Sequence, residues 1–315
     1  MTFWSQQRVT VTGGTGFIAT HVVEALKRRG ARVFPVAHKE FDLTREPDVE
    51  RLFAEHPADI VIHLAGLIGG ILAIKERPAD FIYANLLMNA YVLHHAWKNK
   101  VKKVVSIGAG CGYPLDAPTP LKEESLWDGS PQAETAPYAL AKRLLSVHSD
   151  AYAQQYGFVG VTVIPGNVYG PFDNFNLRSA NVVPALIRKF VEATEQNAPS
   201  VEVWGSGRAA RDFVYVADLA DGMLAAAERL DATTLINISS GEETPIRRVV
   251  EILTKATGFR GQVAWNTSRP DGQLHRRLDT TRAEQMLGWK AGTSLEEGLQ
   301  ITVDWYRKNQ NEARK

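Results

Sequence analysis

The sequence predicts an α/β protein, with a Rossmann-type doubly wound parallel sheet followed by a smaller C-terminal substrate-binding region. Three observations lead to this prediction. Short apolar segments rich in β-branched residues alternate with helical segments in the first third of the chain, which is typical of parallel strands covered on both faces. A glycine-rich loop stands between the first predicted strand and the first predicted helix. After about Gly170 the alternation becomes irregular, which indicates a different region.

The individual elements follow from composition and hydrophobic period. In the first part, strands are predicted over 8–12, 32–36, 59–64 and 103–108, and helices over 21–29, 49–56, 85–100 and 138–156. Gly30 ends the first of these helices. After Gly170, the pattern predicts helices over 183–194 and 294–309 and short strands over 201–204, 212–216 and 235–238. We therefore expect a dinucleotide-binding domain over 1–170, to which the chain returns near 210–240, and a mainly substrate-binding region over 171–315.

Composition limits the classes of function. The chain has 315 residues, with 36 Lys and Arg against 35 Asp and Glu. A net charge of +1 argues against binding nucleic acid or an anionic membrane through bulk charge. The single cysteine, Cys111, cannot form an internal disulfide, and the first residues lack the pattern of a signal peptide. The longest apolar stretch, 60–74, is too short to span a bilayer. We expect a cytoplasmic enzyme with no metal site.

The loop Thr12–Ala19 has the features of a pyrophosphate-binding loop. Glycines at positions 13 and 16 allow a tight turn and let backbone N–H groups approach a pyrophosphate at the positive end of the following helix. Ala19 takes the last slot of the motif, as is typical of short-chain dehydrogenases. Because the loop lies between a strand and a helix near the N-terminus, it predicts a dinucleotide cofactor.

The end of the second predicted strand addresses the 2′ position of the cofactor. An acidic residue there favours NAD, whereas basic residues favour the 2′-phosphate of NADP. His38 and Lys39 occupy this place, and the first acidic residue is Glu40. This favours NADP, with NAD as the alternative; the charges also fit an ordinary solvated turn.

Tyr138 and Lys142 are the candidate catalytic pair. Four residues apart on a helix, the phenol and the ammonium project from one face. A nearby ammonium and a positive nicotinamide both favour phenolate, so we expect the pKa of Tyr138 to be lowered towards the range useful for proton transfer. The lysine can also hold the ribose of the cofactor. The pair follows the glycine loop and the 103–108 strand at the spacing that a dehydrogenase needs.

With these motifs, the sequence resembles the extended short-chain dehydrogenase/reductases, and within them the GDP-L-fucose synthases, which epimerise and reduce GDP-4-keto-6-deoxymannose. The likeness extends nearly from end to end. It includes the segments 69–71, 78–85, 111–114 and 137–142. It continues through the more specific segments 167–175, 183–188, 203–207, 211–216 and 270–272.

The resemblance implies roles at matching positions. Tyr138 would protonate the sugar C4 oxygen as hydride arrives, with Lys142 as its partner and Cys111 as an epimerisation acid/base. Asn167, Lys189, Trp204, Arg211 and Arg276 would bind the substrate, the basic side chains holding the nucleotide diphosphate. Trp204 is also compatible with a core position, Arg211 with a structural ion pair, and Cys111 with a small buried hydrophobe. The cofactor-binding residues that motifs and resemblance together predict are Gly13, Thr15, Gly16, Phe17, Ile18, His38, Lys39, Asp42, Leu43, Leu64, Ala65, Gly66, Tyr138, Lys142, Pro165, Asn167 and Val168.

Two positions depart from the family pattern. Ala109 stands where the family has a serine or threonine whose hydroxyl bonds the reacting sugar oxygen; loss of such a donor costs about 10²–10³ in rate. A water, Ser106 or a hydroxyl of a different substrate is the alternative donor. Asn181 stands where the family has a histidine acid/base, and an amide only forms hydrogen bonds. Gly110 and Cys111 replace the Asp-Glu pair of the related dehydratases, which argues against 4,6-dehydration.

These observations predict an NAD(P)-dependent nucleotide-sugar epimerase/reductase that acts through C4 keto chemistry on a sugar linked most simply to GDP. Two alternatives remain: a redox-neutral nucleotide-sugar epimerase with tightly bound NAD(P), and a non-catalytic protein that binds the cofactor or the nucleotide sugar. The resemblance also implies a homodimer that packs the segments 86–100 and 138–156 into a four-helix bundle.

Overall fold

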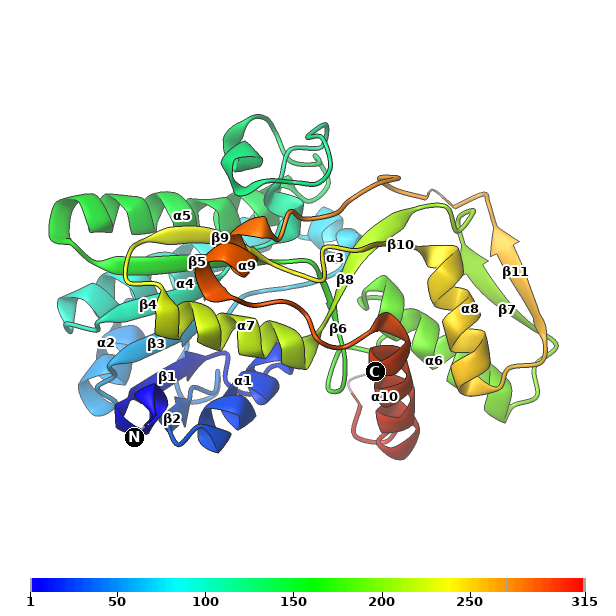
Figure 1. Cartoon of the computed structure of the whole chain (residues 1–315), viewed down its shortest axis with the longest axis horizontal. Helices are drawn as coiled ribbons and strands as arrows, with labels where there is room; N and C mark the ends of the chain where they lie inside the picture. Colours follow the sequence, from blue (N-terminus) through cyan, green and yellow to red (C-terminus); the bar gives the residue numbers. More distant parts are fainter. Residues whose placement is uncertain (1, 270, 314–315) are drawn as a thin grey trace.

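The computed structural model describes residues 2–269 and 271–313, and it confirms the predicted fold class (Figure 1). Six parallel strands form the main sheet in the order β2-β1-β3-β4-β5-β9. Their bounds are β1 (Arg8–Thr12), β2 (Arg32–Pro35), β3 (Ile60–His63), β4 (Lys103–Ile107), β5 (Val159–Pro165) and β9 (Thr234–Ile238). Pro270, the first residue of the 270–272 motif, lies outside the described residues.

Helices cover both faces of this sheet. On one face, α1 (Phe17–Arg28), α7 (Val216–Arg229) and α9 (Thr281–Leu287) pack against one apolar core. On the other, α2 (Glu46–Glu55), α4 (Pro78–Lys98) and α5 (Ala136–Tyr156) enclose another. Alternate strand residues supply the two cores, as Val104 and Val105 of β4 do. Burial on both faces explains why the strands are almost continuously apolar in sequence.

The direction of winding reverses next to β1. The chain passes from β1 to β2 on one side and then crosses to β3 on the other. In doubly wound sheets, ligands bind at the carboxyl ends of the strands at such a switch point. Thr12 and His63, the last residues of β1 and β3, are register partners there.

The remaining elements form a second lobe, on the right of Figure 1. Strands β6 (Asn167–Tyr169), β8 (Ala210–Tyr215) and β10 (Glu243–Pro245) form one small sheet, and β7 (Ser200–Trp204) with β11 (Gln262–Asn266) forms another. Helices α6 (Val182–Glu195), α8 (Ile246–Thr257) and α10 (Leu295–Lys308) pack on a core that includes Tyr169, Phe190 and Tyr306. Four short helical segments are η1 (Phe3–Gln6), α3 (Ile71–Glu76), η2 (Gly110–Gly112) and η3 (Glu123–Trp127).

The structure corrects several predicted bounds. The helix predicted over 85–100 begins at Pro78, because proline is well suited to the first turn of a helix. The first helix begins at Phe17, directly from the glycine loop, rather than at residue 21. The α-helices and strands that were not predicted are α3, β5, β6, α7, β10, α8, β11 and α9. Five of these follow Gly170, in the part of the chain where the alternation of strand and helix patterns is irregular.

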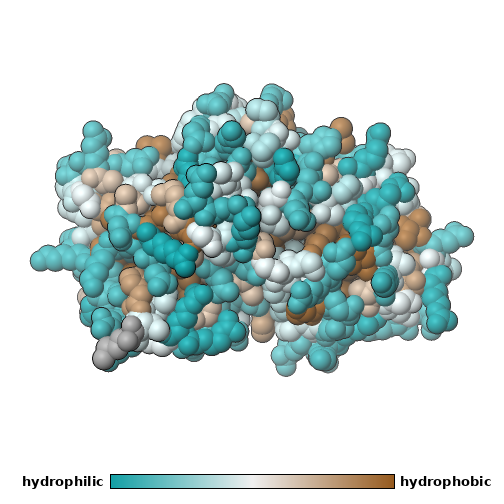
Figure 2. Space-filling model, viewed as in Figure 1, coloured by the Kyte–Doolittle hydropathy of each residue, from teal (hydrophilic) through white to brown (hydrophobic). Residues whose placement is uncertain are grey.

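The surface carries mainly hydrophilic residues on the face drawn in Figure 2, where apolar residues show in separate patches. Among the described residues, no helix combines the length and the apolar character that crossing a bilayer requires.

Candidate active site

The glycine loop lies against two neighbouring strand ends. Gly13 has a φ of +64°, and a Cβ on it would meet the backbone of Ala65 at 3.0 Å. A Cβ on Gly14 would lie 2.6 Å from the Cα of Pro35. The Gly16 N–H donates to the Gly13 carbonyl at 2.8 Å, and α1 starts at the next residue. Only glycine fits this turn, which leaves the start of α1 open to a phosphate group.

The other predicted cofactor residues surround this loop in part. Thr15 is exposed, and Phe17 and Ile18 form the first turn of α1. Leu64, Ala65 and Gly66 follow β3, whereas Leu43 belongs to the core between α2 and α4. Pro165 ends β5, and Asn167 and Val168 lie in β6, paired with Phe213 and Val214 of β8. The strands thus place most of the predicted set at the carboxyl edge of the sheet.

His38 and Lys39 are exposed in the turn after β2. Asp42 is the acidic residue among the predicted cofactor-binding residues. Its Oδ1 accepts hydrogen bonds from the N–H and the hydroxyl of Thr44, at 3.0 and 2.7 Å. The Thr44 hydroxyl lowers the pKa of Asp42, which keeps it a carboxylate engaged with its own turn. The two exposed basic side chains are therefore the groups available to a 2′-phosphate.

Tyr138 lies in the first turn of α5, half-buried and edge-on to Phe81 with ring centroids 6.4 Å apart. Lys142 follows one turn later and is buried, and its Nζ donates to the Ile107 carbonyl at 3.2 Å. The same Nζ lies 3.3 Å from where a Cβ on Gly66 would stand. Lys142 is thus held between the ends of β3 and β4, and Tyr138 lies one turn before it on α5.

The expected lowering of the Tyr138 pKa is wrong for the protein without its ligands. Burial raises the pKa of Tyr138, and the negative charge that Cys111 carries when ionised acts in the same direction. Burial also lowers the pKa of Lys142, to about 8. In this state Tyr138 is a protonated phenol, the form required of a group that donates a proton.

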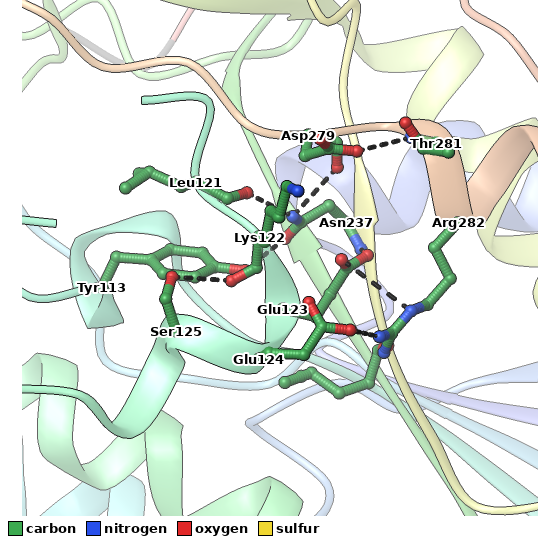
Figure 3. Close-up of polar contacts among 11 residues, drawn as sticks. Tyr113, Leu121, Lys122, Glu123, Glu124, Ser125, Asn237, Asp279, Thr281 and Arg282 are labelled. Carbon is green, nitrogen blue, oxygen red and sulfur yellow. Dashed lines mark hydrogen bonds and ion pairs between the residues drawn. The ribbon is translucent and has the colours of Figure 1, made fainter. Parts of the chain in front are cut away.

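Cys111 lies in a turn that a buried network holds in place (Figure 3). The Tyr113 hydroxyl donates to Asn237 Oδ1 at 2.7 Å, and Asn237 Nδ2 donates to the carbonyls of Leu121 and Asp279, at 3.0 Å each. Glu123 accepts from the Asn237 N–H at 2.9 Å. Tyr113 is therefore a structural anchor of the turn, and the buried polar atoms of this network are satisfied by one another.

Three cations oppose the effect of burial on Cys111. Burial raises the pKa of the thiol, whereas Arg276, Lys142 and Arg143 lower it. Arg276 is also hydrogen-bonded to Cys111, and its Nη2 lies 3.0 Å from where a Cβ on Gly110 would stand. The net pKa of the thiol stays above its usual value, and the three cations make its ionisation less costly than burial alone would.

Arg143 is one residue that the sequence did not single out. It is 5% exposed, donates to the carbonyls of Gly112 and Gly129, and has a buried Nη2 without a partner among the described residues. The sequence signal that could have identified Arg143 is its position directly after Lys142. A charged side chain in the buried part of a helix needs a partner that compensates its charge.

Arg276→Gln is expected to slow alkylation of Cys111 by iodoacetamide about tenfold at neutral pH. Removing a neighbouring opposite charge raises an acid's pKa by about 1–3 units, so less thiolate is present at a given pH. The more basic thiolate is also more nucleophilic, which recovers part of the loss. Cys111 is the single cysteine of the chain, so the labelling rate reports on it alone.

Arg277→Gln is the matched control, because it removes the same charge from the adjacent position and should leave the rate within a factor of about two, as surface charges have weak effects. Equal rates in the Arg276 and Arg277 variants would show that Arg276 does not act on the thiol.

Asn181 is the N-cap residue directly before α6 and is exposed. The preceding carbonyls of Ser179 and Ala180 lie 3.4 and 3.7 Å from where a Cβ on Gly70 would stand, so this segment packs beside the loop before α3. Its amide can orient a hydroxyl or a water, but it exchanges no proton at useful rates.

Ala109 precedes η2 and lines a small cavity with Lys142 and Arg143. Ser106, the alternative hydroxyl on this strand, is 1% exposed within β4. Its register partners are His63 and Thr162 of the neighbouring strands. Because Ser106 is enclosed in the sheet, it does not replace the missing hydroxyl at the surface of the site.

Trp204 is 50% exposed, so the core position considered for it is wrong. Lys189 Nζ lies 5.3 Å from the centre of its ring and Arg269 Cζ 4.9 Å from it. Lys189 also donates to the Glu202 carbonyl at 3.0 Å, which fixes the ammonium beside the ring. Arg269 was not predicted from the sequence. An exposed indole between two cations suits a flat, negatively charged ligand.

Arg276 lies close enough to Arg211 to disfavour the charge of the Arg211 guanidinium. The Arg211 guanidinium donates to the carbonyls of Ala210 and Gln273 at 2.7 and 2.5 Å rather than pairing with a carboxylate. Burial, together with Arg276, lowers the pKa of Arg211 to about 10. Neighbouring half-buried guanidinium groups of this kind favour an anion such as a diphosphate.

Metal ligands do not gather in this site: in residues 2–269 and 271–313, no three His, Cys, Asp or Glu side chains are grouped to hold an ion.

Comparisons with known proteins agree with this geometry. Residues 9–239 match the NAD dependent epimerase/dehydratase family. The GDP-L-fucose synthase of Escherichia coli K12 is 37% identical over 320 residues, covering 98% of this chain and 99% of that protein. The crystal structure of a GDP-L-fucose synthetase from Naegleria fowleri bound to NADP is 29% identical, with a TM-score of 0.94 and coverage of 100% of this chain and 97% of that one. A GDP-mannoheptose C4 reductase from Campylobacter jejuni with NADP bound is 31% identical, with a TM-score of 0.88 and coverage of 97% and 100%.

Proposed function

This chain belongs to the NAD dependent epimerase/dehydratase family, and we propose that it reduces the C4 keto group of a GDP-linked sugar with NADPH. It is a nicotinamide-dependent GDP-sugar enzyme of the epimerase/reductase type, like the relatives that cover nearly its whole length. The observation that carries the proposal is the position of Lys142 between the ends of β3 and β4, one turn after Tyr138 on α5.

The cofactor supplies the hydride, and the residues of the site fit it. The close approach of Gly13 and Gly14 to the backbones of Ala65 and Pro35 shapes a loop for a pyrophosphate. His38 and Lys39 stand free for a 2′-phosphate, in line with the NADP bound by structural relatives. NAD is the alternative cofactor. Lys142 holds the ribose, and Tyr138 donates the proton to the C4 oxygen.

The cationic residues of the second lobe favour a nucleotide diphosphate as the handle of the substrate. Lys189 and Trp204 form one cluster, and Arg211 and Arg276 form another. Two relatives are named after GDP-linked sugars: the GDP-mannoheptose C4 reductase and the GDP-L-fucose synthase. Asn167, at the start of β6, would contact the nicotinamide and the sugar.

Proton exchange beside the keto group has one candidate group. Cys111 can release and take up a proton, whereas inversion at carbon needs removal from one face and delivery to the other. Asn181 cannot serve the second face. We therefore propose C4 reduction as the main reaction, with exchange by Cys111 on one face of the sugar.

Reaction of GDP-4-keto-6-deoxymannose with NADPH in deuterated water tests this proposal, with the product examined by NMR and mass spectrometry. The expected result is consumption of NADPH, with deuterium at no more than one carbon beside C4 and no inversion there. A reaction without protein corrects for spontaneous exchange of the keto sugar.

Other products would change the assignment. Inversion at both C3 and C5 would show that the complete epimerase reaction proceeds without a histidine at position 181. Inversion without consumption of NADPH, by protein that retains its cofactor through purification, would identify a redox-neutral epimerase. Absence of turnover across a panel of nucleotide sugars, with cofactor binding intact, would favour a binding protein.

We also propose that the chain forms a homodimer through α4 and α5. Leu140, Leu144 and Val147 lie along one side of α5 and are 37%, 43% and 45% exposed. Tyr83 of the neighbouring helix α4 is 67% exposed. Apolar side chains at this spacing form a stripe that a second copy of the helix pair can cover.

Leu144→Arg should convert the dimer to a monomer, because it places a charge at the centre of the stripe. Sedimentation velocity measures the change. Ile301→Arg on α10, at a residue that is 39% exposed, is the matched control and should leave the dimer intact. A monomeric parent protein, or a dimer that survives Leu144→Arg, would contradict the proposed interface.

A further inference from the structure

A buried polar chain crosses the switch point of the sheet behind the site. The Thr12 hydroxyl at the end of β1 lies 2.7 Å from His63 Nδ1 at the end of β3. His63 Nε2 lies 3.0 Å from Oδ1 of Asn89 in α4. Asn89 Nδ2 donates to the carbonyl of Ala141 in α5 at 3.1 Å. None of the three linked side chains is more than 4% exposed.

The partners of Thr12 fix which nitrogen of His63 carries the proton. Thr12 Oγ1 accepts from the N–H groups of Leu64 and Ala65, at 3.2 Å each. A hydroxyl has two lone pairs and one proton, so this one donates its proton to His63 Nδ1. Nε2 then carries the ring proton and donates to Asn89 Oδ1. The amide orientation agrees, because Asn89 Nδ2 is left to donate to Ala141.

Every link in this chain touches a part of the site. Thr12 precedes Gly13 of the glycine loop, and Leu64 and Ala65 lead to Gly66. Ala141 is the residue before Lys142, and Asn89 connects to it through α4. The His63 imidazole therefore links the glycine loop to α5, the helix that carries Tyr138 and Lys142.

The environment of His63 keeps the ring in one form. Burial lowers its pKa to about 3, and the positive charge of Lys142 acts in the same direction. A protonated ring would have two donors and no acceptor for Thr12. Since the ring stays neutral at working pH, the direction of every hydrogen bond in the chain is constant.

We propose that His63, as the neutral Nε2–H tautomer, is a positioning residue that holds the glycine loop and the β3 end in register with Tyr138 and Lys142. This inference rests on the proposed function for the roles of Tyr138 and Lys142, whereas the hydrogen-bond chain is independent of that function. Small displacements in such a site are costly, since a shift of about 1 Å can lower a rate about 10²-fold.

Two amide variants separate the two halves of the chain. In His63→Asn the side-chain oxygen can still accept from Thr12 but does not reach Asn89. In His63→Gln the side-chain amide can donate to Asn89 but leaves Thr12 without an acceptor. His95→Gln is the matched control, because His95 is a 1% exposed histidine in the same helix as Asn89, with Nε2 3.1 Å from Glu46 Oε1.

The first test needs neither substrate nor turnover. In nitrogen-15 histidine spectra of the wild-type protein, the signals lost in both His63 variants should show the Nε2–H tautomer, unchanged between about pH 5 and 8. An Nδ1–H tautomer, or titration within this range, would overturn the proposal. The tautomer is read from the wild-type protein, and one folded His63 variant is enough to assign its signals.

The second test measures NADPH affinity and turnover at temperatures well below unfolding. Loss of the Thr12 link in His63→Gln should weaken NADPH binding about tenfold, as expected for one buried hydrogen bond. Loss of the Asn89 link in His63→Asn should lower kcat at saturating NADPH more than it raises KM. If the two His63 variants, like His95→Gln, only unfold at a lower temperature and keep their NADPH affinity and kcat, the role of His63 is purely structural. An inactive wild-type protein would count against the proposed function, while NADPH affinity and the tautomer would still decide this inference.

Discussion

Tyr138→Phe is expected to lower the turnover of a GDP-linked 4-keto sugar by about 10²–10⁴-fold, the usual contribution of a general acid. The phenol at the start of α5 is protonated in the free protein, because burial raises its pKa. In the proposed arrangement Lys142 still holds the ribose, so we expect the affinity for NADPH to change little. Single-turnover oxidation of NADPH, together with a fluorescence titration of NADPH, measures the two quantities separately.

Tyr156→Phe is the matched control for this substitution. It removes the same hydroxyl from the last residue of the same helix, where the ring stacks on Trp97 with centroids 4.1 Å apart. Turnover of the control should equal that of the parent. A Tyr138→Phe protein with undiminished turnover would show that another group protonates the C4 oxygen, and a parallel loss of NADPH affinity would mean that the ring serves the cofactor instead.

Ala109→Ser is expected to raise kcat for a 4-keto sugar by up to about 10²–10³-fold, the effect of one hydrogen-bond donor at a reacting oxygen. The alanine lies two residues after the end of β4 and lines a small cavity with Lys142, and the substitution adds a single oxygen atom there. The gain should appear mainly in kcat, because the bond to the C4 oxygen strengthens as charge develops there.

Ala133→Ser provides the control, since it makes the same change at an exposed position before α5 and should leave kcat unaltered. If Ala109→Ser gives no gain, the natural substrate or a bound water already supplies the donor. If it lowers kcat, the space at Ala109 is itself used by the substrate, and a sugar larger at that position becomes the next one to assay.

The sequence predicted the architecture well where one local signal sufficed. Strand β1 is found over the residues expected, and the glycine loop leads into α1 as the motif required. The elements of the second lobe were harder to predict. Strand β10 has three residues, and helix α8 follows it directly at Ile246. Such short elements depend on their neighbours more than on their own pattern.

The candidate site was predicted in its reacting groups but not in its supports. Tyr138, Lys142 and Cys111 stand in recognisable motifs, and the roles assigned to them remain predictions. Arg143 and Arg269 were not singled out, and neither was His63. Each takes its place only when distant segments meet, as when Arg269 reaches Trp204 of β7. No local pattern contains such a pairing.

By itself, the sequence determined the fold class, the cofactor loop and the identity of the groups able to transfer protons, because these depend on residue type and short spacing. The tertiary structure decided how those groups are charged and held. It raised the pKa of Tyr138 by burial, surrounded Cys111 with cations and joined Thr12 to Asn89 through one imidazole. Desolvation and hydrogen-bond direction depend on every neighbour in space, and only the folded chain brings those neighbours together.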